Sequence, residues 1–169
     1  MLFRSGTRMF APQDTLWLWW LANPSAPQLV GELRLVRSGR AVSLEYGPEW
    51  LATGFPLSED LPLRAGTYLP AEIDLAAGAV DDARPDRWGE RVIRKFEESP
   101  RLSLLEFLLF AGDDRYGALG VGRSAADYQP WQASPVPQLN DLAAMADVIR
   151  KVLANEPVRE IERRLVRPG

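Results

Sequence analysis

One segment of the sequence has the glycine spacing of a phosphate-binding loop. Gly117 and Gly122 are separated by four residues, and Arg123 and Ser124 follow directly. A working loop of this type has lysine where Arg123 stands, and it connects a strand to a helix so that backbone N–H groups surround the phosphates. Here a turn-like sequence precedes the segment and prolines follow it. We therefore expect a short strand over residues 118–121, with nucleotide binding by Gly117 to Ser124 as the weaker alternative.

Two groups of aspartates are candidate ligands for a metal ion. Asp81 and Asp82 are adjacent, with Asp86 nearby, and Asp113 and Asp114 form the second pair. Carboxylate oxygens are the ligands that Mg²⁺ prefers, so either group could hold this cation. Adjacent acidic residues beside a helix start or in a turn more often cap the backbone or face water. The sequence therefore favours no metal site.

Tryptophan is frequent, with six residues in a chain of 169. Trp50 and Trp88 could form an aromatic binding platform. Tryptophan more often lies in cores and interfaces because of its large apolar area, so we favour that role.

The residue types that are missing exclude several kinds of chemistry. The chain contains no Cys and no His, so it has no disulfides, no thiolate nucleophile, no zinc site of the usual Cys/His type and no histidine base. The formal net charge of −3 gives no overall basic field, so we expect no direct contact with nucleic acid. The apolar run over residues 15–22 is too short to cross a bilayer. We expect a cytoplasmic protein without membrane contact.

Alternating patterns in the first third of the chain predict antiparallel strands. Residues 16–21 are apolar at both alternating positions, which indicates a strand covered on two sides. Residues 30–36 and 42–46 alternate apolar and polar positions on either side of a turn at 38–40, which predicts a hairpin. Residues 50–70 contain three prolines and two glycines, so we expect an ordered loop with short extended pieces.

Helices follow in the middle of the sequence. Pro85 can open the first, because a missing N–H costs nothing in the first turn. Its apolar stripe consists of Trp88, Val92 and Phe96. Ser103 and Glu106 have the spacing of a capping box, and the almost wholly apolar segment behind them reaches Gly112. The second helix should therefore be buried.

These elements predict an α+β domain with attached segments. We assign residues 1–14 to a flexible leader, 15–129 to one domain, 130–137 to a proline-rich linker and 138–169 to a helical segment. Asn140 can cap the last helix. Its shared apolar face should consist of Leu142, Met145, Ile149, Val152 and Leu153.

Four blocks in fixed order resemble the N-terminal subdomain of HipA-like serine/threonine kinase toxins, over residues 15–122. The blocks are residues 46–51 (Tyr-Gly-Pro-Glu-Trp-Leu), 57–63, 82–89 and 108–119, the last containing Gly-Asp-Asp-Arg-Tyr-Gly at 112–117. The resemblance implies a small antiparallel sheet, often a partly closed barrel, with packed helices, in front of a kinase core. Such kinases belong to bacterial toxin–antitoxin modules, phosphorylate protein targets such as glutamyl-tRNA synthetase, and are restrained by a DNA-binding antitoxin.

The resemblance carries no catalytic residue over to this sequence. In the family, the glycine-rich loop, the ATP-contacting lysine, the catalytic aspartate and the magnesium-binding groups lie in the later core, and no position here matches them. We therefore expect no cofactor for this chain, since ATP and Mg²⁺ belong to a complete family member. Residues 138–169 look like the helical link toward that absent core.

The sequence thus predicts a non-catalytic interaction or scaffold domain, either truncated or one piece of a split toxin. A kinase core or an antitoxin is the expected partner, and the oligomeric state stays open. The alternatives are a stand-alone antitoxin-like or protein-docking module and the nucleotide-binding protein considered above. We expect the protein interface on the exposed side of the helix after Pro85. Its candidate residues are Arg87, Glu90, Arg91 and Arg94.

Overall fold

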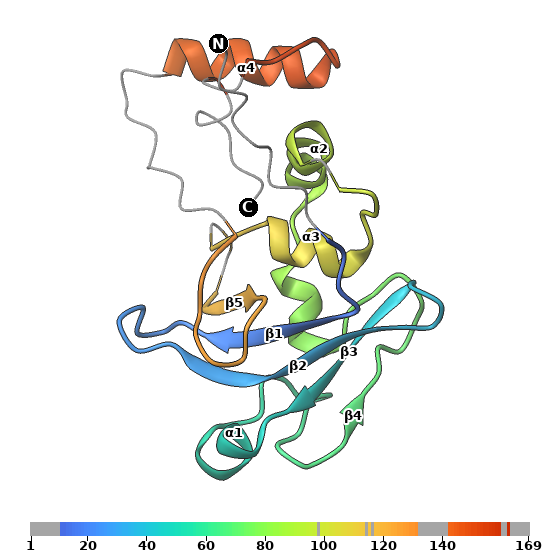
Figure 1. Cartoon of the computed structure of the whole chain (residues 1–169), viewed down its shortest axis with the longest axis vertical. Coiled ribbons are helices and arrows are strands. Elements are labelled where there is room, and N and C mark those ends of the chain that lie inside the picture. Colours follow the sequence, from blue (N-terminus) through green and yellow to red (C-terminus); the bar gives the residue numbers. More distant parts are fainter. Residues whose placement is uncertain are drawn as a thin grey trace, which may run out of the picture.

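The computed structural model describes residues 11–97, 99–113, 115, 117–131, 142–159 and 162. The described residues form a five-stranded antiparallel sheet, with α2, α3 and α4 above it and α1 below it in the view of Figure 1, which confirms the expected α+β class. The sheet is open and is not closed into a barrel. Its strands are β1 (Thr15–Trp20), β2 (Gln28–Val36), β3 (Ala41–Tyr46), β4 (Thr67–Tyr68) and β5 (Leu119–Gly122), in the spatial order β4-β3-β2-β1-β5.

The first strand has neighbours on both edges, as its sequence predicts. It pairs with β2 on one side and with β5 on the other. Leu16 and Leu18 point into the main core, and Trp19 is buried on the opposite face of the sheet. Burial on both faces explains why this segment lacks the polar positions of a half-exposed strand.

The predicted hairpin is confirmed by β2 and β3. Leu33 lies opposite Leu44, and Leu35 lies opposite Val42, so both arms place their apolar positions on one face. Gly39 adopts a positive φ of 85° in the connecting turn, a conformation that glycine reaches without steric cost.

Three of the helices, α3, α2 and α4, form a stack above the sheet, and α1 lies at its lower end (Figure 1). The α-helices are α1 (Pro48–Thr53), α2 (Arg87–Phe96), α3 (Leu104–Phe110) and α4 (Leu142–Leu153), and η1 (Gly78–Ala83) is a 3-10 helix. The third helix packs on the sheet, α2 packs on α3, and α4 packs on the far side of α2. Within the part of the chain that the structure describes, no helix has the length and apolar character needed to cross a membrane.

Two helix predictions need correction. The segment expected to be a loop from residue 50 begins inside α1, where Pro48 occupies the first turn and Glu49 lies at the positive end of the helix dipole. Burial of Trp50 then holds this short helix against the sheet. The second correction concerns Pro85, which precedes α2 because Asp86 is the N-cap and accepts the Gly89 N–H at 2.7 Å.

The capping box of α3 is confirmed. The Glu106 carboxylate accepts the backbone N–H of Ser103 at 2.8 Å and also accepts from its hydroxyl. Glu106 is 1% exposed, and Arg101 neutralises it through a hydrogen bond of 3.0 Å from Nε. Arg101 also binds Asp14 at 2.6 Å, so it joins the end of the predicted leader to the start of α3.

The predicted apolar face of α4 is only partly correct. Val148 and Val152 are buried against α2, whereas Leu142, Ile149 and Leu153 are exposed. Asn140 lies outside the described residues, as does most of the predicted linker. The described end of that linker is Trp131, which packs on Phe110 with ring centroids 4.9 Å apart.

Candidate protein-docking site

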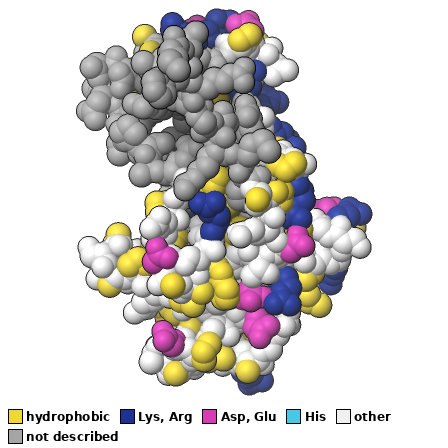
Figure 2. Space-filling model, in the orientation of Figure 1, with side chains coloured by type: hydrophobic (Ala, Val, Ile, Leu, Met, Phe, Trp, Pro, Cys, Tyr) yellow, Lys and Arg dark blue, Asp and Glu magenta, His cyan; other side chains and the backbone are white. Residues whose placement is uncertain are grey.

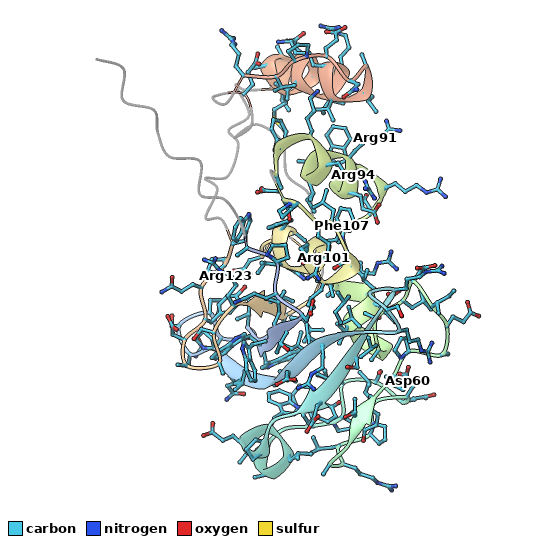
Figure 3. All side chains as sticks on the ribbon, turned by 45° about the vertical axis from the view of Figure 1, so that its right-hand side comes forward. Asp60, Arg91, Arg94, Arg101, Phe107 and Arg123 are labelled. Carbon is cyan, nitrogen blue, oxygen red and sulfur yellow. The ribbon has the colours of Figure 1, made fainter. Side chains whose placement is uncertain are left out.

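The second helix has three faces with different surroundings. Ile93 packs into the main core and Gly89 is buried beside it, and an apolar stripe of Trp88, Val92 and Phe96 meets α4. Arg87, Arg91 and Arg94 occupy the remaining face and are exposed. Figure 3 shows Arg91 and Arg94 on the outside of α2, with Phe107 of α3 beneath them. Figure 2 shows basic side chains following one another down this edge of the molecule.

The four predicted interface residues lie on one helix, but they fall into two electrostatic groups. Glu90 is 29% exposed and lies 3.5 Å from Arg94 and 3.8 Å from Arg84. The guanidinium of Arg94 also lies 4.7 Å from the ring centroid of Phe107. Arg87 and Arg91 form no ion pair or hydrogen bond through their side chains with any residue the structure describes. Sequence spacing could have separated the two groups, because Glu90 and Arg94 are related as i and i+4.

Neighbouring residues fix the position of α2 at both ends. Arg84 precedes the helix and contacts Glu90, Asp81 at 3.2 Å and the carbonyl oxygen of Asp74 at 3.2 Å. At the other end, Lys95 donates to the side chain of Asn155, beyond α4, at 3.2 Å. The exposed arginines are therefore carried by a helix that is anchored to the sheet loops and to α4.

Arg115 holds η1 against the end of α3, a role that the sequence analysis did not predict. Its guanidinium donates to the carbonyl oxygens of Ala83 at 3.0 Å, Leu108 at 2.8 Å and Gly112, so it joins η1 to the end of α3. Burial lowers the pKa of Arg115 from its usual value. A partly buried arginine whose hydrogen bonds go to carbonyl groups could not be recognised from spacing, because its acceptors belong to the backbone.

The segment with phosphate-loop spacing is built differently, and its predicted strand is confirmed by β5. Gly120 faces Tyr128 across the sheet surface, and a Cβ at this position would lie 2.5 Å from the tyrosine Oη. The Ser124 hydroxyl accepts the Ala126 N–H at 3.0 Å, and the Arg123 guanidinium lies 5.2 Å from the Trp131 ring centroid. No helix begins within residues 123–131. Gly120 therefore serves strand packing, and the segment lacks the following helix of a phosphate-binding loop.

The aspartates considered as metal ligands have separate structural partners. Asp81 accepts the backbone N–H of Ala76 at 2.8 Å and pairs with Arg84, while Asp86 caps α2. Asp113 accepts from the Tyr128 hydroxyl, and its partner in the sequence, Asp114, lies outside the described residues. Among the residues that the structure describes, no three acidic, Cys or His side chains gather as a metal site would require.

The two tryptophans considered as a platform lie in different clusters. Trp50 is 3% exposed and contacts Trp20 and Phe55, with ring centroids 6.2 and 5.0 Å away. Trp88 belongs to the contact between α2 and α4. Both therefore have the core and interface role that we favoured.

Comparison with known families agrees with the resemblance seen in the sequence. A family model described as the HipA N-terminal domain matches residues 25–122, which is more than half of the chain. A search of curated proteins found no match. The matched region contains β2 to β5, α2 and α3, whereas β1 precedes it and α4 follows it. The chain belongs to the family of HipA N-terminal domains.

Proposed function

We propose that this chain is a non-catalytic interaction domain of a HipA-like serine/threonine kinase toxin in a bacterial toxin–antitoxin module. It docks onto a kinase core or an antitoxin in the cytoplasm, binds no ATP itself and makes no direct contact with nucleic acid. The observation that carries this proposal is the match of residues 25–122 to the HipA N-terminal domain.

The surface of α2 supports a docking role. This helix lies within the matched region, and its three exposed arginines are not required to cover the sheet. A firmly anchored helix presents these side chains without rearrangement of the backbone, so binding carries little backbone ordering cost. A rigid scaffold with an exposed charged face is suited to binding.

Calorimetry with purified components tests the proposal. The chain should release no phosphate from ATP in the presence of Mg²⁺. It should bind a separately produced HipA-like kinase core, or the associated antitoxin, with a saturable heat. A chain that binds neither protein would contradict the proposal and favour the stand-alone docking module. Phosphate release that is lost on Arg123→Ala would instead restore the nucleotide-binding alternative.

A further inference from the structure

The positive charges in the first half of α2 oppose the stability of the helix. Arg87 is its first residue, where the macrodipole is positive and disfavours a cation. Arg91 has Arg87 at i−4, Arg94 at i+3 and Lys95 at i+4, and like charges at these spacings destabilise a helix. Helix formation alone therefore does not account for these two arginines.

The nearby carboxylates do not neutralise this pair. Glu90 is directed to Arg84 and Arg94, on either side of the pair, and Asp86 accepts the Gly89 N–H as the N-cap. No described carboxylate lies within ion-pair distance of Arg87 or Arg91. Their two guanidinium groups are therefore oriented into solvent one helical turn apart, about 6 Å along the axis.

We propose that Arg87 and Arg91 bind an acidic polypeptide segment of the partner protein, with Arg94 at the edge of the contact. This inference rests on the proposed docking function and specifies its chemistry. Each guanidinium can donate two parallel hydrogen bonds to one carboxylate, which gives orientation as well as charge. Carboxylates about 6 Å apart on the segment match the spacing of the two arginines. Binding relieves the repulsion along α2 that the free domain retains.

The local charge fits an acidic protein segment better than a nucleic acid. A protein that neutralises only two phosphates gains little from counterion release, and this chain carries a net charge of −3. Other exposed arginines without a described carboxylate partner, such as Arg37 and Arg64, lie in loops at other places in the fold. The α2 pair is therefore a compact contact for two carboxylates on one short segment.

Fluorescence anisotropy with a labelled synthetic peptide tests the proposal on the full chain. The probe is a glutamate-rich peptide, and the same peptide with glutamine at every glutamate is its control. Arg87→Gln with Arg91→Gln should weaken binding of the acidic peptide about five- to twentyfold at low salt. Arg37→Gln with Arg64→Gln removes the same charge elsewhere and should change the affinity less than twofold. Arg87→Lys with Arg91→Lys keeps the charge and should fall between them, because lysine cannot form the bidentate contact.

Several outcomes would overturn the proposal. The first is that the two double glutamine variants weaken peptide binding equally. The second is that the wild-type protein binds the glutamine peptide as tightly as the glutamate peptide. The third is that it binds a single-stranded oligonucleotide of the same charge more tightly than the acidic peptide. If the kinase core or antitoxin binds wild type and the Arg87/Arg91 glutamine variant equally, the docking function stands and this inference fails. If neither protein binds while the acidic peptide still discriminates the variants, the docking function fails and the charge site remains.

A stability measurement separates this binding role from a structural one. Arg91→Glu places a carboxylate between Arg87, Arg94 and Lys95, which converts three repulsions into attractions. We expect the melting temperature to rise by about 1–3 °C while peptide binding is lost. A fall in melting temperature would show that Arg91 supports the fold, and the proposal would then lose its basis.

Discussion

At the scale of single residues, Arg115 shows how one side chain can organise a loop without any acidic partner. Its guanidinium binds the carbonyl groups of Ala83 in η1 and of Leu108 and Gly112 at the end of α3, so it joins two segments of the chain. Hydrogen bonds to charged groups contribute about 1.5–3 kcal/mol each, and buried carbonyls that lose their donor carry a further cost. Arg115 should therefore be essential to the seam between η1 and α3.

Replacing Arg115 by methionine should destabilise the protein by about 3 kcal/mol, because the apolar chain fills the space but leaves the carbonyl groups unbound. Equilibrium unfolding in urea measures this loss. Arg64→Met is the matched control, since Arg64 is exposed and its side chain makes no hydrogen bond with a described residue; its effect should stay within about 0.5 kcal/mol. Equal effects of the two substitutions would contradict the role assigned to Arg115.

Two glycines in β5 allow a second comparison at the same scale. A Cβ on Gly120 would lie 2.5 Å from Tyr128 Oη and 2.6 Å from Leu21 Cδ1. A Cβ on Gly122 would meet its nearest atom, Tyr128 Cδ2, at an ordinary 3.5 Å. Tyr128 has little freedom to move, because its hydroxyl binds Asp113 and its ring lies 5.8 Å from that of Trp19.

Gly120→Ala should therefore destabilise the protein by about 1–3 kcal/mol through overpacking. Gly122→Ala should be neutral or slightly stabilising, because alanine restricts the unfolded chain without a clash. Thermal unfolding of both variants provides the measurement, and near-UV circular dichroism follows the Tyr128 and Trp19 environment. The same melting temperature for both would show that Tyr128 yields easily.

The sequence predicted local structure well, but it did not predict which residues distant in the chain contact one another. The capping box of Ser103 and Glu106 could be read directly, because both groups lie within one helical turn. The contact of Arg101 with Asp14 joins positions 87 residues apart, and no local pattern encodes it. Periodicity was enough to predict which face of α2 is exposed. The ion pair between Arg84 and Glu90 could be seen only in the structure, because Arg84 lies outside the helix.

At the scale of elements, α2 and α4 are joined by a small apolar contact. Val92 of α2 packs with Val148 and Val152 of α4, and Trp88 and Phe96 border them. Periodicity placed the α2 stripe correctly, but it assigned too many residues to the buried face of α4. A short helix rich in Leu, Ile and Val has two adjacent apolar rows, and only its partner decides which row is covered.

Val152→Ala should loosen α4 from α2 without unfolding the sheet, because it removes about 1–2 kcal/mol of buried packing. Hydrogen exchange of the α4 amides should become faster while the β2 and β3 amides keep their protection. Val92→Ala acts from the opposite helix and should produce the same local change. Leu153→Ala is the adjacent control and should leave exchange unchanged, since Leu153 is 56% exposed. Faster exchange throughout the protein after Val152→Ala would contradict a separable contact.

At the scale of the whole molecule, the described residues form two apolar clusters of very different size. The large one unites the sheet, α1, η1 and α3, together with Ile93 of α2. The small one lies between α2 and α4 and is completed by Val158. Because α2 contributes to both, it connects the part that matches the HipA N-terminal domain with the helical segment beyond it. Composition predicted one principal core, but the division of α2 between two clusters depends on tertiary packing.

A chain ending at Trp131 should therefore still fold. It keeps every described residue of the large cluster, so we expect cooperative unfolding and an unchanged near-UV circular dichroism signal from the sheet. Removing α4 uncovers Trp88, Val92 and Phe96, and the shortened chain should bind the dye ANS more strongly than the full chain. Val92→Ser in the shortened chain should reduce the added dye binding, which assigns it to the α2 stripe. Loss of cooperative unfolding would mean that the α2–α4 contact is part of the main folding unit, and the large cluster alone would not be enough to define this domain.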